Sequence, residues 1–249
     1  MTVIADKVLV VFLDEALSAA DNSAAAAATS AESKAFSEVA ALGCNGFLVL
    51  PEITQGKREL SGLESVLGVV HDGGNAQFKF PKMPVAFFSA SSSACALAKS
   101  LGFEIQLVFL HLDAHVSEDH WVHALVLDLL LQQERDADSR CLVALVQSAR
   151  QPHHPQQNAG SSSSPFWPRQ SYEKVNGQYA AESSSSSTTN AELRRLLLSF
   201  YQKDRTRRDA VQRFDEAQID ALGSYGAMSA LMFLKEVAFR LGFAPKYGA

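Results

Sequence analysis

Cysteine is scarce in this 249-residue sequence, which has only Cys44, Cys95 and Cys141. The three lie far apart and none belongs to a Cys-X-X-Cys pair, which argues against a disulfide framework and against a zinc knuckle. Each lies in or beside an apolar stretch, where a free thiol usually behaves as a small buried hydrophobe. This cysteine usage is typical of a reducing compartment, so we expect a cytoplasmic protein.

An excess of basic residues is also missing. Lysine and arginine number 22 against 27 acidic residues, for a formal charge of −5 at pH 7. Nucleic-acid-binding surfaces usually carry a basic field, which this composition does not supply. The densest basic run, RTRRD at residues 205–209, is more typical of a solvated loop than of a phosphate-binding stripe. We therefore expect no nucleic-acid partner.

Long hydrophobic runs are absent as well. No apolar run reaches the roughly eighteen residues that a helix needs to span a bilayer. The N-terminal residues 1–13, MTVIADKVLVVFL, have no basic region ahead of an apolar core, so they predict a first strand rather than a secretory signal. We expect no membrane partner. The apolar content of 47% is ample for a buried core.

Short apolar runs alternate with helical segments along the chain. The runs that predict buried strands are residues 7–13, 46–50, 84–90, 103–112 and 141–147. The segments with helical spacing are residues 30–42, 91–102, 122–133 and 229–242. This alternation predicts a single α/β domain over residues 1–249, with a mainly parallel sheet and helices on both faces.

The composition changes between about residue 148 and residue 190. HHPQQNAGSSSSP and AESSSSSTTN are too polar and too repetitive to contribute to a core. We expect a Ser-rich, disordered surface insertion here. FWPRQSYEKVNGQ, between the two serine runs, is the part best suited to dock on the fold.

The C-terminal residues 213–249, RFDEAQIDALGSYGAMSALMFLKEVAFRLGFAPKYGA, contain a Phe-Asp-Glu turn, two spaced glycines, a long apolar helix and a final Lys-Tyr-Gly-Ala. They resemble the C-terminal end of archaeal-type 2,3-bisphosphoglycerate-independent phosphoglycerate mutases, which are metal enzymes of the alkaline phosphatase superfamily. KVLVVFLDEALSAAD at 7–21 and SSSACALAKSLGFEIQLVFLH at 91–111 resemble that family's opening strand and the helix–strand unit before its metal-binding loop. The resemblance implies an alkaline-phosphatase-like three-layer sandwich, here without the family's inserted lid domain.

Residues 191–203, AELRRLLLSFYQK, are compatible with two structures. Local rules predict a helix capped by Asn190. The resemblance instead makes the apolar centre of this segment a strand. We predict the strand, because intrinsic propensity is a weak guide inside a sheet protein.

In that family a serine attacks the phosphoryl group, while two divalent metals held by Asp and His stabilise the developing charge. The resemblance places Asp14 at the first metal-binding acid, at the carboxyl end of the first strand, where ligand sites of open α/β sheets lie. Asp14 is equally compatible with a structural role, as an acid that caps the next segment. Ser61 falls where the family has its nucleophile, with Ser65 as the fallback. The acidic, small-residue motif that follows the family's serine is absent.

Four of the seven histidines and three acids lie in FLHLDAHVSEDHWVH at residues 109–123. On the family's metal-binding loop, His120 matches a histidine ligand, but Val116 takes the place of the aspartate four residues earlier. The acids that could replace that aspartate are Asp113, Glu118 and Asp119. The candidate metal ligands of the chain are therefore Asp14, Asp113, His115 and His120, for Mn, Mg or Zn.

The same stretch has two further interpretations. His115, Asp119 and His123 are spaced i, i+4, i+8 and would share one face of a helix, which could bind a transition metal without catalysis. A partly solvated helix start with Ser117 as its N-cap is at least as compatible.

The family's second ligand motif, an Asp-His pair after the fifth strand, corresponds here to Ser148 and Ala149. Losing ligands weakens a metal site badly, because those that remain cannot neutralise or desolvate the ion. We expect a phosphoglycerate-mutase-like domain that is catalytically weak or inactive, a possible pseudoenzyme that binds a protein partner or a small phosphate ester. The alternative is a metal-dependent phosphomutase or phosphomonoester hydrolase with a rearranged site and Ser61 as its nucleophile.

Overall fold

A computed structural model provides the fold of the chain. The residues that it describes are 4–14, 33–50, 62–72, 75–78, 83, 85–89, 91–101, 107–112, 120–136, 140–149, 174–175, 178–179 and 195–245. Statements about structure below refer to these residues.

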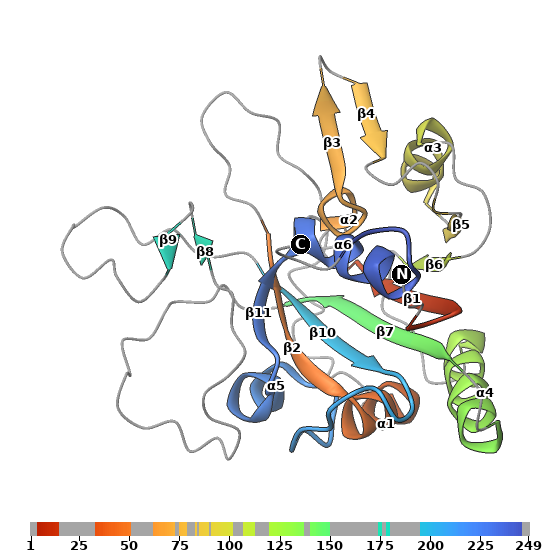
Figure 1. Ribbon diagram of the computed structural model, residues 1–249, viewed down its shortest axis with the longest axis vertical. Helices are drawn as coiled ribbons and strands as arrows, with labels where there is room; N and C mark the ends of the chain where they lie inside the picture. Colours follow the sequence, from red (N-terminus) through yellow and green to blue (C-terminus); the bar gives the residue numbers. More distant parts are fainter. Residues whose placement is uncertain are drawn as a thin grey trace, which may run out of the picture.

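A seven-stranded sheet forms the centre of the described part (Figure 1). Its strands, in spatial order, are β11 (Gly226–Ser229), β2 (Cys44–Val49), β10 (Arg195–Tyr201), β7 (Cys141–Ser148), β1 (Lys7–Leu13), β6 (Leu107–Leu112) and β5 (Val85–Ser89). β10 pairs antiparallel with both of its neighbours. Every other pair in this sheet is parallel. The prediction of a mainly parallel α/β sheet is confirmed.

Helices cover both faces of the sheet, which gives three layers. One face carries α2 (Gly62–Val66) and α6 (Ala230–Arg240), with α3 (Ser92–Ser100) beside the edge strand β5. The other face carries α1 (Lys34–Leu42), α4 (Trp121–Arg135) and α5 (Glu216–Leu222). Figure 1 shows the two helical layers on opposite sides of the strands. The expected three-layer sandwich is therefore present.

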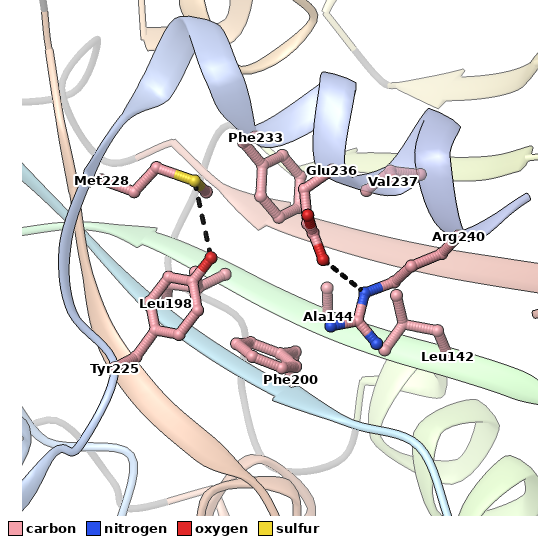
Figure 2. Close-up of a pocket in the computed structure, with 10 residues that line it drawn as sticks. All are labelled: Leu142, Ala144, Leu198, Phe200, Tyr225, Met228, Phe233, Glu236, Val237 and Arg240. Carbon is pink, nitrogen blue, oxygen red and sulfur yellow. Dashed lines mark hydrogen bonds and ion pairs between the residues drawn. The ribbon is translucent and has the colours of Figure 1, made fainter. Parts of the chain in front are cut away.

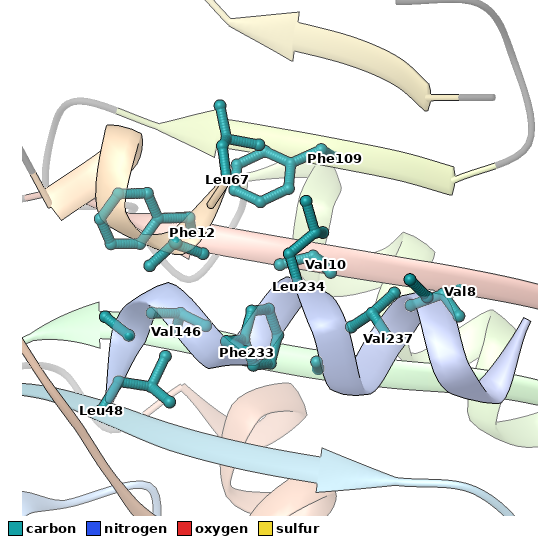
Figure 3. Packing of buried hydrophobic residues seen from close by; sticks show 14 of the residues in the cluster. Val8, Val10, Phe12, Leu48, Leu67, Phe109, Val146, Phe233, Leu234 and Val237 are labelled. Carbon is teal, nitrogen blue, oxygen red and sulfur yellow. The ribbon is translucent and has the colours of Figure 1, made fainter. Parts of the chain in front are cut away.

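Strand β1 shows why its sequence forms a central strand. Successive side chains of a strand point to opposite faces, so Val8, Val10 and Phe12 pack in the core under α6. Leu9, Val11 and Leu13 pack against α1 and α4 on the other face. Figure 3 shows the α6 side of this core. Burying a side chain of this size contributes roughly 1.5–3 kcal/mol, which explains the unbroken apolar run.

The ambiguous segment near residue 195 is a strand, as predicted. β10 lies between β2 and β7, and Leu196, Leu197 and Leu198 are all buried. They alternate between the two cores, which a helix with one apolar face could not achieve. Burial on both faces therefore overrides the local helical propensity.

Helix α1 is shorter than predicted, because it begins at Lys34 rather than at residue 30. The Ser33 side chain caps its start by accepting the N–H of Phe36 at 3.3 Å. Gly43 ends the helix, as expected. A Cβ on Gly43 would lie 2.5 Å from the carbonyl oxygen of Phe200, so the close approach of β10 requires glycine at this position.

The structure also contains elements that the sequence patterns did not predict. They are α2, α5, β11 and the antiparallel pair β3 (Val69–Asp72) and β4 (Asn75–Phe78). β11 consists of small residues without a β-branched signal, and Gly226 at its start has φ +75°. Short elements of this kind are fixed by tertiary packing rather than by local pattern.

The insertion predicted at about 148–190 begins later than expected, because Ser148 is the last residue of β7. Within it, β8 (Lys174–Val175) pairs antiparallel with β9 (Gln178–Tyr179). Most of the insertion lies outside the described residues. Its disorder and its docking on the fold therefore stay predictions. Among the described helices, none is long and apolar enough to cross a bilayer.

All three cysteines are free thiols. Cys44 and Cys141 are buried, and desolvation raises the pKa of both thiols. A raised pKa keeps a thiol protonated and unreactive, so these two residues behave as core side chains.

Candidate functional site

Four adjacent strands end in polar side chains at one edge of the sheet. Asp14 follows β1, His111 lies near the end of β6, Ser89 ends β5 and Ser148 ends β7. We call these four residues the strand-end cluster. Their strands are parallel and adjacent, so their carboxyl ends meet at the edge where open α/β sheets place their ligand sites.

The alternation of side chains puts the whole cluster on the face covered by α6. Phe12, Phe109 and Val146 pack in the core on that face, and Asp14, His111 and Ser148 each follow one of them by two residues. A spacing of two keeps side chains on the same face of a strand. Ser89 is the register partner of His111 across the β5–β6 pair. The sheet therefore brings the four polar groups side by side.

Hydrogen bonds link the cluster into one chain. Ser89 Oγ lies 2.7 Å from His111 Nδ1, and His111 Nε2 lies 3.5 Å from Asp14 Oδ2. Ser148 donates its hydroxyl to Asp14 Oδ1 at 3.4 Å. The backbone N–H of Ser91 donates to Ser89 Oγ at 3.0 Å. An imidazole thus bridges a hydroxyl and a carboxylate.

The cluster is buried in the middle and partly exposed at its two ends, Ser89 and Ser148. His111 is 1% exposed and Asp14 is 5% exposed. Two aromatic rings fix the imidazole, with centroid distances of 5.7 Å to Phe12 and 6.3 Å to Phe87. Ser89 is only partly buried, so the cluster is in contact with solvent at this residue.

The predicted site residues are only partly within the described residues. Asp14 lies at the carboxyl end of β1, as predicted, and its metal-binding role stays a prediction. Ser61, Asp113 and His115 lie outside the described residues. Ser65, the fallback nucleophile, is 0% exposed inside α2, and its role as a nucleophile stays a prediction.

His120 is the N-cap of α4, where its Nδ1 accepts the backbone N–H of Val122 at 3.3 Å. The predicted cap at Ser117 is therefore wrong, since α4 begins at Trp121. The extended backbone of His120 also excludes one continuous helical face from His115 to His123. His123 is buried instead, bonded to Ser33 Oγ at 2.6 Å.

The described donors do not fit a two-metal centre. Within the described ranges, no group of three or more His, Cys, Asp or Glu side chains is placed to hold a metal ion. The strand-end cluster supplies one carboxylate, one imidazole and two hydroxyls. Paired divalent cations need several carboxylate or imidazole ligands each. Of the two residues that the resemblance aligns with an Asp-His pair, Ser148 donates a hydrogen bond to Asp14 and Ala149 packs against the apolar core.

The sequence analysis missed His111, Ser89 and Ser148 as members of a site. The signal for them was period-two alternation within each strand. In LVFLHL and VAFFS, counting back from the polar residue by twos reaches the apolar residues of one face. A polar residue on an otherwise buried face, at the carboxyl end of a strand, indicates a site at that edge.

A small cavity lies between α6 and the sheet, away from the cluster (Figure 2). Its volume of about 20 Å³ is close to the room that one water needs. Leu142 and Ala144, from the first half of β7, line it. Glu236 and Arg240 pair at its rim with a separation of 2.9 Å. This cavity is a packing gap in the core and too small for a substrate.

Comparison with known proteins supports the fold. No protein-family model matches the chain, and no curated protein matches it. The solved structure of the PH0037 protein from Pyrococcus horikoshii is similar, with a TM-score of 0.52, 12% sequence identity and 100% of each chain covered. At this identity the likeness shows a shared α/β architecture.

Proposed function

We propose that the protein is a phosphoglycerate-mutase-like domain of the alkaline phosphatase superfamily that has lost most of its metal ligands. In this proposal it has weak or no phosphoryl-transfer activity and acts as a binding or assembly module in the cytoplasm. Its ligand is a protein partner or a small phosphate ester, held at the carboxyl edge of the sheet.

The observation that carries this proposal is the bond between Ser148 and Asp14. Asp14 lies where the family has its first metal-binding acid, and Ser148 lies where the family has another ligand. Instead of sharing a cation with a second carboxylate, Asp14 accepts the Ser148 hydroxyl at 3.4 Å. A hydroxyl is a neutral donor, so this pair cannot offset the charge of two divalent ions.

Two further features support membership of the superfamily. The mainly parallel sheet between two helical layers agrees with the expected sandwich. The C-terminal stretch that carries the resemblance forms α5, β11 and α6, and α6 covers the core beneath the strand-end cluster.

The test is a metal titration of the stripped protein, followed by thermal unfolding. A ligand at 100 times its Kd stabilises the folded state by about 2.7 kcal/mol. We expect no such shift with manganese, magnesium or zinc, and no hydrolysis of p-nitrophenyl phosphate. Asp14→Asn is the matched control for any shift that does occur. Metal-dependent turnover that Ser61→Ala abolishes would overturn the proposal.

The alternative function is a metal-dependent phosphomutase or phosphomonoester hydrolase. The close approach of His111 Nε2 to Asp14 Oδ2 favours it, because a carboxylate and an imidazole 3.5 Å apart can contact one ion. Asp113, His115 and His120 would have to complete the site, with Ser61 as nucleophile. If metal stabilises the protein but Ser61→Ala changes no activity, the protein binds metal without catalysis.

A further inference from the structure

We propose that Ser89, His111 and Asp14 form a metal-independent serine relay that hydrolyses small neutral carboxylic esters. The proposal goes beyond the binding function, since it assigns a covalent chemistry to the same sheet edge. It rests on the hydrogen bonds, burial and accessibility of the three side chains.

The direction of the bonds makes Ser89 a proton donor to His111. An ionised carboxylate can only accept hydrogen bonds, so the contact with Asp14 requires the proton on His111 Nε2. Nδ1 of the neutral ring then has a lone pair, and Ser89 must donate to it across 2.7 Å. The N–H of Ser91 takes up one acceptor site of the same hydroxyl. This is the arrangement of a nucleophile, a general base and an orienting acid.

The surroundings hold the base in one orientation. Phe87 stacks on the His111 ring with an interplanar angle of 19°, and Phe12 packs against it from the neighbouring strand. Both His111 and Asp14 lie out of water, where hydrogen bonds are electrostatically stronger. Ser89 itself is only partly buried. A preorganised base with an accessible nucleophile is what acyl transfer requires.

Helix α3 begins beside the nucleophile. Ser91 is its N-cap, and the Ser91 side chain accepts the N–H of Ala94. The N–H groups of Ser92 and Ser93, in the first turn, have no partner within the helix. These donors and the positive end of the helix dipole can stabilise the oxyanion that forms during attack.

The charge of the cluster selects the substrate class. Asp14 is its one acidic side chain, and none of its four residues is a lysine or an arginine. Phosphoryl transfer from a phosphate ester would need cations to stabilise the developing charge, and these four residues supply none. A neutral carboxylic ester needs only the hydroxyl, the imidazole and the N–H donors.

The reaction needs only water as a second substrate. Ser89 Oγ bonds to the ester carbonyl carbon while its proton moves to His111 Nδ1. The tetrahedral intermediate then breaks its bond to the leaving oxygen, and Nδ1 gives that oxygen the proton, so the alcohol departs. Water attacks the acyl carbon and gives a proton to Nδ1. The bond between the acyl carbon and Ser89 Oγ then breaks, and Nδ1 returns the proton to Oγ. The products are one carboxylic acid and one alcohol, with Ser89 restored.

The experiment uses the full chain in the presence of EDTA, with p-nitrophenyl acetate and a fluorophosphonate probe. We expect chelator-resistant release of p-nitrophenol and a single adduct that peptide mass spectrometry places on Ser89. Ser89→Ala should abolish the adduct and lower the esterase rate by about 100-fold or more. Ser100→Ala is the matched control, since Ser100 is an exposed serine at the far end of the same helix, and it should react like the original protein.

Asp14 acts through His111, so its variant tests positioning. Asp14→Asn should lower kcat and leave KM unchanged, because it affects the orientation of the base and not substrate binding. An adduct on Cys95 or Lys99 in place of Ser89, or an unchanged rate in Ser89→Ala, would overturn the relay. Both outcomes leave the binding function standing. Metal-dependent phosphate hydrolysis would refute the binding function without any change at Ser89.

Discussion

Asp14 and Asp209 are both buried carboxylates, at 5% and 4% exposure, but they lie at opposite edges of the sheet. Asp14 is at the carboxyl edge, just after β1. Asp209 contacts Asn45 near the start of β2, which runs parallel to β1 and therefore begins at the amino edge. Ligand sites favour the carboxyl edge of such sheets. The two carboxylates can therefore be compared as a site group and a structural group.

Their hydrogen bonds differ accordingly. Asp209 accepts four N–H donors at 2.8–3.2 Å, from Asn45 N, Asn45 Nδ2, Val211 N and Ser224 N. Among the described residues, Asp14 accepts Ser148 at 3.4 Å and faces His111 at 3.5 Å. A carboxylate saturated by short bonds holds loops together, whereas one with long bonds has acceptor capacity left for a ligand or a proton relay.

The largest effect is expected for Asp209→Ala. This change leaves several buried N–H groups without an acceptor, and each unsatisfied donor costs about 1–3 kcal/mol. We expect the free energy of unfolding to fall by about 3–5 kcal/mol, as for other broken buried charge networks. Urea unfolding followed by circular dichroism measures it. A loss below about 1 kcal/mol would remove the distinction between the two carboxylates.

A double-mutant cycle tests whether Asp209 and Asn45 belong to one hydrogen-bond network. Asn45 gives Asp209 two of its bonds, and its own Oδ1 accepts the Ser199 hydroxyl. Asn45→Ala removes the side-chain bond and keeps the backbone one. We expect Asn45→Ala and Asp209→Ala to be non-additive by about 1–3 kcal/mol, as for residues in one network. Simple addition of the two losses in urea unfolding would show that the contacts act independently.

Long helices and strands are easier to predict from the sequence than short ones, because a longer segment shows its hydrophobic pattern more clearly. The runs at 7–13 and 141–147 were located to within a residue, because strands buried on both faces need unbroken apolar sequence. The strand at 195–201 depended on the resemblance, since its local pattern is helical. β11 and α2 were missed because four or five small or mixed residues carry no usable period.

The candidate site was harder to predict than the fold. Asp14 was a candidate because the resemblance places an acid at the end of the first strand, and its metal-binding role stays a prediction. His111 and Ser89 were missed, since their partnership depends on the register of β5 against β6, which no single segment encodes. Asp209 was also missed, because RTRRD was interpreted only as a solvated loop. In the structure the Asp209 carboxylate accepts the backbone N–H of Asn45. Contacts between segments that are far apart in the sequence can be identified only from the tertiary structure.

A smaller effect is expected for Asp14→Asn. The variant keeps one carbonyl oxygen for Ser148 and gives up only long contacts. We expect the free energy of unfolding to change by about 1 kcal/mol or less, or to rise, since replacing site residues often stabilises a protein. Urea unfolding beside Asp209→Asn is the matched measurement. Equal losses in the two variants would identify Asp14 as a structural group.

The last effect depends on pH and concerns a third carboxylate, Glu134, which is exposed and accepts the Tyr201 hydroxyl at 3.1 Å. Burial, and then the bond to Glu134, raises the pKa of Tyr201 to about 12, above the value of about 10 expected in the unfolded chain. The neutral phenol is thus favoured by folding, and its contribution is fully present below pH 10. It is lost as the pH rises from about 10 to about 12, because the unfolded state ionises first. Tyr201→Phe should therefore flatten the decline of unfolding free energy over this interval, and Tyr179→Phe serves as the control substitution. An unchanged slope in Tyr201→Phe would show that an exposed carboxylate with a single donor does not couple to stability at all.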